Sequence, residues 1–157
     1  MKTLASALLL LCLPLAMQAQ SKKDVKKNGI KSVTETITEN GKTRKDEVKN
    51  FNADGQPSEE IEYLEDGTVK VQRTYKYNSN GDVTEEIKMN GASSILEKKV
   101  YTYNKFGDKD TETEFDGKGQ LVKKYQYVYD KFGLKTERKT LDAKGKVMAV
   151  KKFTYTR

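Results

Sequence analysis

The sequence has no histidine and no tryptophan, and it contains one cysteine and two prolines. Without histidine, the common acid–base and nucleophile–base pairs and the usual zinc ligand sets are missing. The one cysteine is Cys12, so no intrachain disulfide can form. These absences predict a chain that is not an enzyme, binds no metal and carries no cofactor.

The N-terminal segment is the one long apolar run. Lys2 precedes a nearly unbroken apolar stretch from Leu4 to Leu15, and Ala19 supplies a small residue at the expected cleavage point. This pattern is typical of a secretory signal peptide and is too short for a membrane span. We therefore expect a secreted protein, either periplasmic or at the cell surface, with a signal peptide over 1–19, a lead-in over 20–29 and a repeat domain over 30–157. The alternative is a retained amphipathic anchor.

The remaining chain has little apolar material. Charged residues make up 34% of the sequence and the mean hydropathy is −0.84, so no thick hydrophobic core is available. The net charge of +7 is spread over interleaved lysines and glutamates, which argues against a nucleic-acid partner. Charged residues at mid-strand positions argue against a membrane-spanning barrel.

What the sequence does have is an internal repeat, and its period of about 26 residues lies in the range typical of repeat architectures. F-N-A-D-G at Phe51 recurs as Y-N-S-N-G at Tyr77, Y-N-K-F-G at Tyr103 and Y-D-K-F-G at Tyr129, and V-K-K-N-G at Val25 is interpreted as a degenerate first copy. A second turn series with the same period lies between these segments, at Gly41, Gly67, Ser93, Gly119 and Gly145. Turns thus alternate along the chain at a shorter and a slightly longer spacing.

The residues of these turns predict hairpins. Most have Asn or Asp at the first position and Gly at the fourth, which is typical of a type I turn followed by a left-handed residue that forms a bulge. The runs between turns are rich in Thr, Val, Ile and Tyr, as strands are. We therefore expect an all-β fold of about ten antiparallel strands in an up-and-down meander, built from five hairpins. A single curled sheet is the first choice and a closed ten-stranded barrel is the alternative.

The turn type also predicts the register. Asn78 should face Asp82, which places Tyr77 opposite Val83 and Arg73 opposite Ile87. Across the preceding turn, Tyr63 should face Val69, and Ile61 should face Val71. Because each repeat has an even number of residues, all odd-numbered strand positions should share one apolar face. Glu85 is then expected opposite Lys99, as a cross-strand ion pair rather than a catalytic carboxylate.

Aromatic residues recur on every second strand of this predicted face. One interpretation is a row of stacking platforms for sugars or for an extended partner chain. The other, which the sequence favours, is that the rings fill a thin core beneath a curved sheet. The candidate ligand-binding residues are Tyr75, Tyr77, Tyr101, Tyr103, Tyr127, Tyr129, Phe153 and Tyr155.

The segments T-Y-K-Y-N-S-N-G at Thr74, V-Y-T-Y-N-K-F-G at Val100 and Y-V-Y-D-K-F-G at Tyr127 resemble the tyrosine-aspartate (YD) repeats of the RHS family. That family comprises bacterial cell-surface and toxin-shell proteins, so the resemblance implies paired β-hairpins in an extended sheet and a location at or beyond the cell envelope. Five copies are too few for an encapsulating shell, and the first two lack the paired tyrosines.

Two functions remain open from the sequence. The first is a secreted or surface-associated, non-catalytic interaction module that binds a glycan or an envelope protein through its aromatic-lined face. The second is a structural repeat segment that associates through its sheet edges with itself or with a larger complex.

Overall fold

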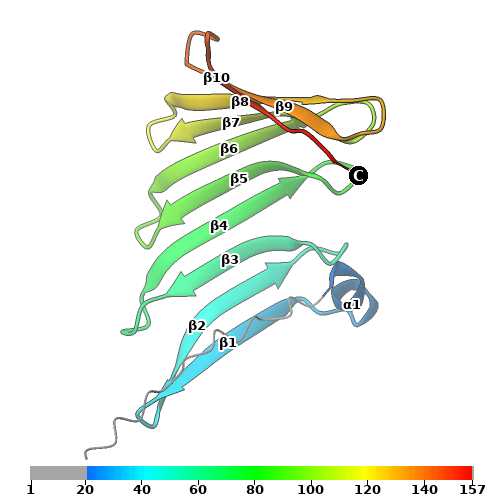
Figure 1. Cartoon of the computed structure of the whole chain (residues 1–157). Helices are drawn as coiled ribbons and strands as arrows, with labels where there is room; N and C mark the ends of the chain where they lie inside the picture. The colour runs from blue at the N-terminus through cyan, green and yellow to red at the C-terminus, as the bar shows by residue number, and fades with distance from the viewer. Residues whose placement is uncertain (1–20, 157) are drawn as a thin grey trace, which may run out of the picture.

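The computed structural model describes residues 21–156, which form one short helix and a ten-stranded antiparallel sheet with its strands in chain order (Figure 1). The elements are α1 (Lys22–Lys27), β1 (Ser32–Glu39), β2 (Lys42–Phe51), β3 (Pro57–Tyr63), β4 (Val69–Tyr77), β5 (Val83–Asn90), β6 (Ile95–Tyr103), β7 (Lys109–Asp116), β8 (Leu121–Tyr129), β9 (Lys135–Leu141) and β10 (Val147–Lys152). The predicted all-β meander is confirmed. The predicted signal peptide, 1–19, lies outside the described residues.

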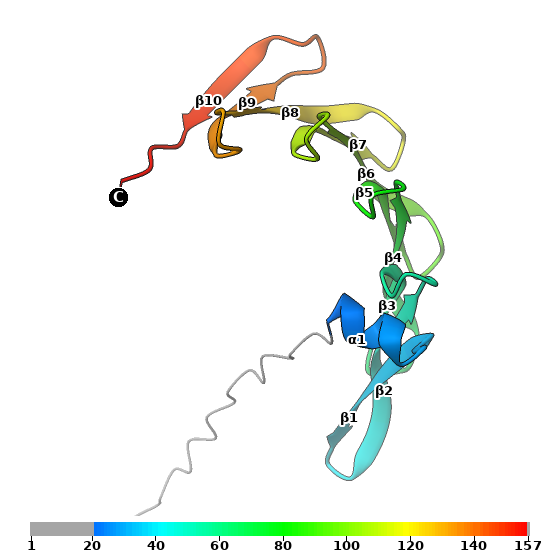
Figure 2. The same ribbon diagram turned by 90° about the vertical axis from the view of Figure 1, so that its right-hand side faces the viewer.

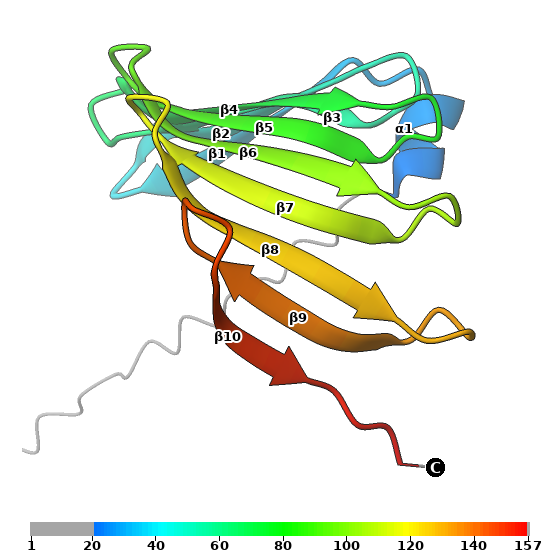
Figure 3. The same cartoon turned by 90° about the horizontal axis from the view of Figure 1, so that it is seen from above.

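The sheet is open and strongly curved. Figure 2 shows it as an arc with β1 and β10 at its two ends, and Figure 3 shows the strands fanning round from one to the other. This progressive rotation is the right-handed twist that strands adopt, accumulated over ten of them. β1 and β10 do not pair, so the curled sheet is confirmed and the closed barrel is wrong.

The turns have the expected geometry. The Asn78 N–H donates to the Asp82 carbonyl at 2.9 Å, and the Gly81 N–H donates back to the Asn78 carbonyl at 3.0 Å. The Asn78 side chain closes the turn, because its Oδ1 accepts from the N–H groups of Asn80 and Asp82. Gly81 has φ +86°, and Ser93, the non-glycine member of the series, adopts φ +60°. The turn chemistry predicted from the sequence is therefore confirmed.

A β-bulge also lies one residue into the strand after these turns, and this second bulge was not expected from the sequence. Tyr77 pairs with Val83 as predicted, but the next pair is Lys76 with Glu85, so Thr84 has no partner. Ser58, Lys70, Leu96, Asp110, Val122, Thr136 and Met148 are bypassed in the same way, each as the second residue of its strand.

Each bulge shifts the register by one residue, and a shift of one exchanges the faces of the sheet. Tyr63 does face Val69. However, Ile61 faces Gln72 instead of Val71, and Ile87 faces Thr74 instead of Arg73. The prediction that all odd-numbered positions share one face is therefore wrong.

The apolar residues are consequently divided between the two sides of the sheet. The tyrosine side carries Phe51, Tyr75, Tyr77, Tyr101, Tyr103, Tyr125, Tyr127, Tyr129, Phe153 and Tyr155. The aliphatic side carries Ile61, Tyr63, Val69, Ile87, Met89, Ile95, Val100, Phe115, Leu121, Leu141 and Val147. Only the first group extends the predicted aromatic row.

The sheet is a single layer with almost nothing enclosed. In the described part of the chain, Val25 of α1 is the one buried apolar side chain, at 1% exposure. It lies beside Phe51 at the turn between β2 and β3. No helix within residues 21–156 has the length and apolar character needed to cross a membrane.

The lead-in is a capped helix, so its interpretation as a degenerate first repeat is wrong. The Ser21 hydroxyl accepts from the Asp24 N–H at the start of α1. At the other end Gly29 has φ +61°, and the Ile30 N–H donates to the Val25 carbonyl. This is a Schellman motif, in which glycine ends a helix. The segment V-K-K-N-G thus resembles a hairpin turn because both structures need a left-handed residue.

Candidate functional site

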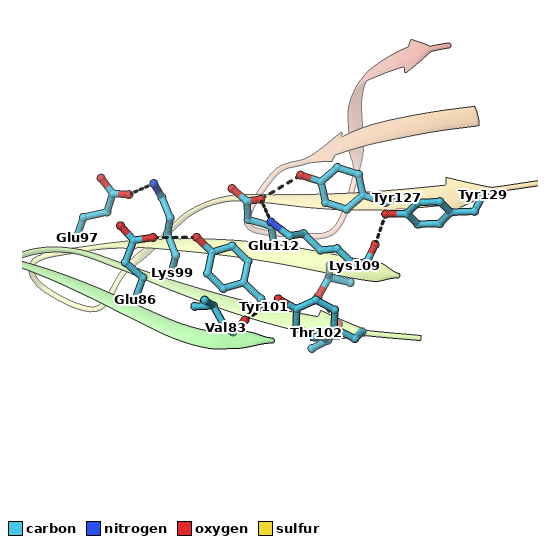
Figure 4. Close-up of polar contacts among 12 residues, drawn as sticks. Val83, Glu86, Glu97, Lys99, Tyr101, Thr102, Lys109, Glu112, Tyr127 and Tyr129 are labelled. Carbon is cyan, nitrogen blue, oxygen red and sulfur yellow. Dashed lines mark hydrogen bonds and ion pairs between the residues drawn. The ribbon is translucent and has the colours of Figure 1, made fainter. Parts of the chain in front are cut away.

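The tyrosine side is organised by hydrogen bonds that join neighbouring strands in successive repeats. In each case a tyrosine hydroxyl donates to Oε2 of a glutamate on the preceding strand. The bonds are Tyr75 to Glu60 (2.8 Å), Tyr101 to Glu86 (3.1 Å) and Tyr127 to Glu112 (3.0 Å). Figure 4 shows the second and third of them. These glutamates are even-numbered. If all odd-numbered positions shared one face, as predicted from the sequence, the glutamates would lie on the opposite, polar face.

A second row of tyrosines bonds to the backbone at the bulges. The hydroxyls of Tyr77, Tyr103, Tyr129 and Tyr155 donate to the carbonyls of Pro57 (2.5 Å), Val83 (2.7 Å), Lys109 (2.9 Å) and Lys135 (2.8 Å). Each acceptor is the first residue of its strand and immediately precedes the bypassed residue. The tyrosine therefore satisfies a carbonyl where the bulge interrupts the ladder.

Lysines cover the rings of two of the three glutamate-bonded tyrosines. The Lys109 Nζ lies 4.3 Å from the ring centroid of Tyr101 and 3.2 Å from Oε2 of Glu112. One repeat later, the Lys135 Nζ lies 4.6 Å from the Tyr127 centroid. These are cation–π distances. The equivalent residue one repeat earlier is Val83, so Tyr75 has no such lysine above it.

The hydroxyls of the three glutamate-bonded tyrosines are held in their protonated, donating form. Burial, together with the Glu86 carboxylate, raises the pKa of Tyr101 well above its usual value. Burial and the Glu60 carboxylate do the same for the pKa of Tyr75. Burial and the Glu112 carboxylate raise the pKa of Tyr127 to about 12. An ionised tyrosine beside a carboxylate would bring two negative charges together, and the fold disfavours that state.

A shallow hollow of ≈ 220 Å³ lies between Tyr75 and Tyr101, two successive glutamate-bonded tyrosines. Its lining residues are Tyr75, Val83, Glu86, Tyr101, Tyr103 and Lys109. Half-exposed aromatic rings, a carboxylate and an ammonium group thus meet in one open depression on the tyrosine side. Glu86, not Glu85, is the residue opposite Lys99, so the bulge places Glu86 in the hollow. Glu85 turns to the other side, where it pairs with Lys76 and Lys98.

All eight candidate residues lie on the tyrosine side, although the C-terminal end of the row differs. One repeat after Tyr127 the equivalent residue is Phe153, which has no hydroxyl. One repeat after Glu112 the equivalent residue is Arg138. The Arg138 guanidinium lies 4.9 Å from the Tyr125 ring centroid, and its Nε is buried without a hydrogen-bond partner. Tyr155 is 53% exposed. The repeating tyrosine–glutamate bond therefore ends at Tyr127, whereas the tyrosine–carbonyl bond continues to Tyr155.

Two exposed features fall outside the predicted site. Phe106 and Phe132, at equivalent turn tips, are 78% and 70% exposed, each with a lysine about 5 Å from its ring. The segments K-F-G at Lys105 and Lys131 were the sequence signal for these exposed rings, because an apolar residue at a turn tip cannot be buried by its own hairpin. On the aliphatic side, a hollow of ≈ 300 Å³ is lined by Ile95, Lys98, Val100, Phe115, Asp116, Gly117 and Gly119.

Comparison with known proteins places the chain in no family. No family model matches it, and no curated protein matches its sequence. Among solved structures, a porin-like protein from Bacteroides uniformis matches with 14% identity over 79% of this chain and 44% of that one, at a TM-score of 0.39. The GtfA/B complex bound to UDP and GlcNAc matches with 12% identity over 76% of this chain and 24% of that chain, at 0.31. A Bacteroides fragilis protein of unknown function matches with 17% identity over 81% and 95%, at 0.15. This chain thus spans less than half the length of the first two, and at these low scores none of the three assigns it a function.

Proposed function

We propose that the chain is a secreted or surface-associated, non-catalytic interaction module whose tyrosine side binds an extended glycan. The observation that carries the proposal is the hollow between Tyr75 and Tyr101. It combines aromatic ring faces with the Glu86 carboxylate and the Lys109 ammonium. Sugars present apolar C–H faces and polar hydroxyl edges, and a surface that alternates rings with charged acceptors and donors complements both.

Hydrogen bonds within the sheet position two tyrosines of this hollow. The Tyr101 hydroxyl is fixed by Glu86, and the Tyr103 hydroxyl is fixed by the Val83 carbonyl. Side chains locked by hydrogen bonds lose little conformational entropy on binding, which favours affinity on a flat, open surface. The same bonds occupy the hydroxyl protons, so a ligand would contact the ring faces, the second carboxylate oxygens and the lysines.

The repetition of the row suits a polymer more than a single sugar. Equivalent tyrosines lie on alternate strands and are therefore roughly 9 to 10 Å apart, twice the strand spacing. This is close to the length of a disaccharide unit in an extended polysaccharide. The resemblance of these segments to YD repeats, and the expected signal peptide, favour a ligand outside the cytoplasm.

The test is co-sedimentation of the mature protein with cell-envelope polysaccharide, using variants that remove a ring but keep apolar volume. Tyr75→Leu and Tyr101→Leu should abolish retention. Phe115→Leu, the same kind of change on the aliphatic side of the neighbouring β7, should leave retention intact. Thermal melts establish that all three variants are folded.

Three outcomes would contradict the proposal. One is a folded wild-type protein that no polysaccharide retains. Another is equal loss of retention in Phe115→Leu and Tyr101→Leu. The third is retention that disappears when the envelope fraction is treated with protease, which would identify a protein ligand instead of a glycan.

A further inference from the structure

We propose that copies of this chain associate head to tail, with the outer edge of β10 in one copy pairing antiparallel with the outer edge of β1 in the next. The contact lies at the two edges of the sheet and is independent of the proposed glycan site. The partner is a second copy of the chain, and the contact continues the same sheet from one copy into the next.

Both edges are available. Among residues 21–156, β1 pairs only with β2 and β10 only with β9. β10 is exposed along its whole length, and its apolar residues Val147, Met148 and Val150 are 47%, 63% and 46% exposed. An open edge strand with exposed apolar side chains and no proline is a template for another strand.

The hydrogen-bonding groups that point outward can be identified on each edge. In antiparallel strands, alternate residues direct their backbone groups to the same neighbour. The Phe153 N–H donates to Thr136 of β9, so Lys151 also faces inward, and the backbone groups of Val150 and Lys152 point outward. On the other edge, the Phe51 N–H donates to the Lys31 carbonyl.

By the same alternation, Val33 and Glu35 direct their backbone groups to β2, and Thr34, Thr36 and Thr38 direct theirs outward. Both edges therefore present their even-numbered residues to a new partner. On β1, and on β10 after the bulge at Met148, the odd-numbered residues lie on the tyrosine side. The two edges can thus pair with their hydrogen bonds aligned and with the tyrosine sides of the two copies continuous.

Charge selects the register. β10 carries Lys151 and Lys152 and no acidic residue, and β1 carries Glu35 and Glu39 and no basic residue. Placing Val150 opposite Thr36 of the second copy brings Lys151 opposite Glu35 and Ala149 opposite Ile37, all on matching sides. Cross-strand pairs of opposite charge and of apolar residues stabilise a sheet. Pairing β10 with β10, or β1 with β1, brings together edges of like charge.

Proline at an outward position tests the contact, because it removes a donor from the free edge without removing one from the ladder within the chain. Val150→Pro blocks β10, and Thr36→Pro blocks β1. The wild-type protein should gain mass with concentration in sedimentation velocity experiments, and each variant alone should be a monomer. An equimolar mixture should form a heterodimer and grow no further, because each copy contributes one intact edge.

A second pair of variants keeps the test independent of proline. Lys151→Glu and Glu35→Lys should each lose association alone and recover it as a mixture, and high salt should weaken the wild-type contact. Circular dichroism establishes that every variant is folded. The proposed contact is ruled out if the wild-type protein is monomeric at all concentrations. It is also ruled out if Thr36→Pro still dimerises by itself, which would indicate β10–β10 pairing, or if neither mixture associates.

Discussion

The Tyr101 hydroxyl donates a 3.1 Å hydrogen bond to Oε2 of Glu86 on the neighbouring strand, and this bond recurs one repeat before and one repeat after. A single-layer sheet cannot stabilise itself by enclosing apolar side chains, so bonds of this kind carry a larger share of its stability. The row is therefore a structural feature whether or not a ligand also binds to it.

The first prediction concerns that bond. Tyr101→Phe should lower the free energy of unfolding by about 1 kcal/mol, because it removes a donor from a half-buried carboxylate and keeps the ring. Urea unfolding followed by circular dichroism measures the change. Phe153→Tyr is the matched control: it adds a hydroxyl where Arg138 replaces the glutamate, and it should give no gain. The double variant Phe153→Tyr with Arg138→Glu should then be more stable than the sum of the single changes. Strict additivity would contradict a specific tyrosine–glutamate bond.

The second prediction concerns alkaline pH. A tyrosine whose pKa is raised in the folded state releases its proton first from the unfolded chain, so the folded state binds more protons above pH 10. For Tyr127, with a folded pKa of about 12, the stability contribution is present below pH 10 and is lost as the pH rises from 10 to 12. The loss should continue at higher pH for Tyr75 and Tyr101. Tyrosinate absorbance should show a delayed group of tyrosines in the folded protein, and Tyr127→Phe should remove part of it. Ionisation of all tyrosines together near pH 10, before unfolding, is the contrary result.

The third prediction concerns Ser93, which adopts φ +60° where the other members of its turn series have glycine. A left-handed conformation costs an L-residue about 1 kcal/mol or more. Ser93→Gly should therefore stabilise the protein by about 1 kcal/mol in thermal unfolding. Gly119→Ala provides the reverse change, since Gly119 has φ +78° and its added methyl group would meet no atom within 4 Å. It should destabilise by about as much, and a stabilising Gly119→Ala would be inconsistent with backbone strain.

The fourth prediction concerns the contact between α1 and the sheet. A methyl group on Gly55 would lie 2.6 Å from the Lys22 carbonyl oxygen and 2.9 Å from the Lys26 nitrogen. Gly107 has the same turn position and a similar φ but meets nothing within 4 Å. Gly55→Ala should thus be clearly more destabilising than Gly107→Ala, and hydrogen exchange should show early opening of α1. Equal effects of the two substitutions would mean that α1 does not pack on this turn in solution.

Much of the fold could be predicted from the sequence because the turns are chemically explicit. Asn78 at the first turn position and Gly81 at the fourth specify a hairpin with one register, and Tyr77 does face Val83. The bulges inside the strands could not be predicted, because no glycine or proline marks Thr84. Val83 and Ile87 are both odd-numbered and both apolar, so the sequence pattern looks uniform although the two residues lie on opposite sides.

The candidate site could be predicted only in part for the same reason. The tyrosines recur visibly and lie together on one side. Glu60, Glu86 and Glu112 recur at the same interval, but without the bulges they would belong to the other side, away from the tyrosines. The glutamates and the tyrosines recur with the same period, and this shared period was the one sequence signal that could have paired them.

The bulges have a consequence for solubility. The bulges transfer the apolar residues from one face of the sheet to the other partway along each strand. Neither face therefore has a continuous apolar surface across its full width. A second sheet could not cover either surface without also desolvating glutamates and lysines, which is costly for unpaired charges. The ribbon can thus stay one layer thick in water while bearing nine tyrosines and five phenylalanines.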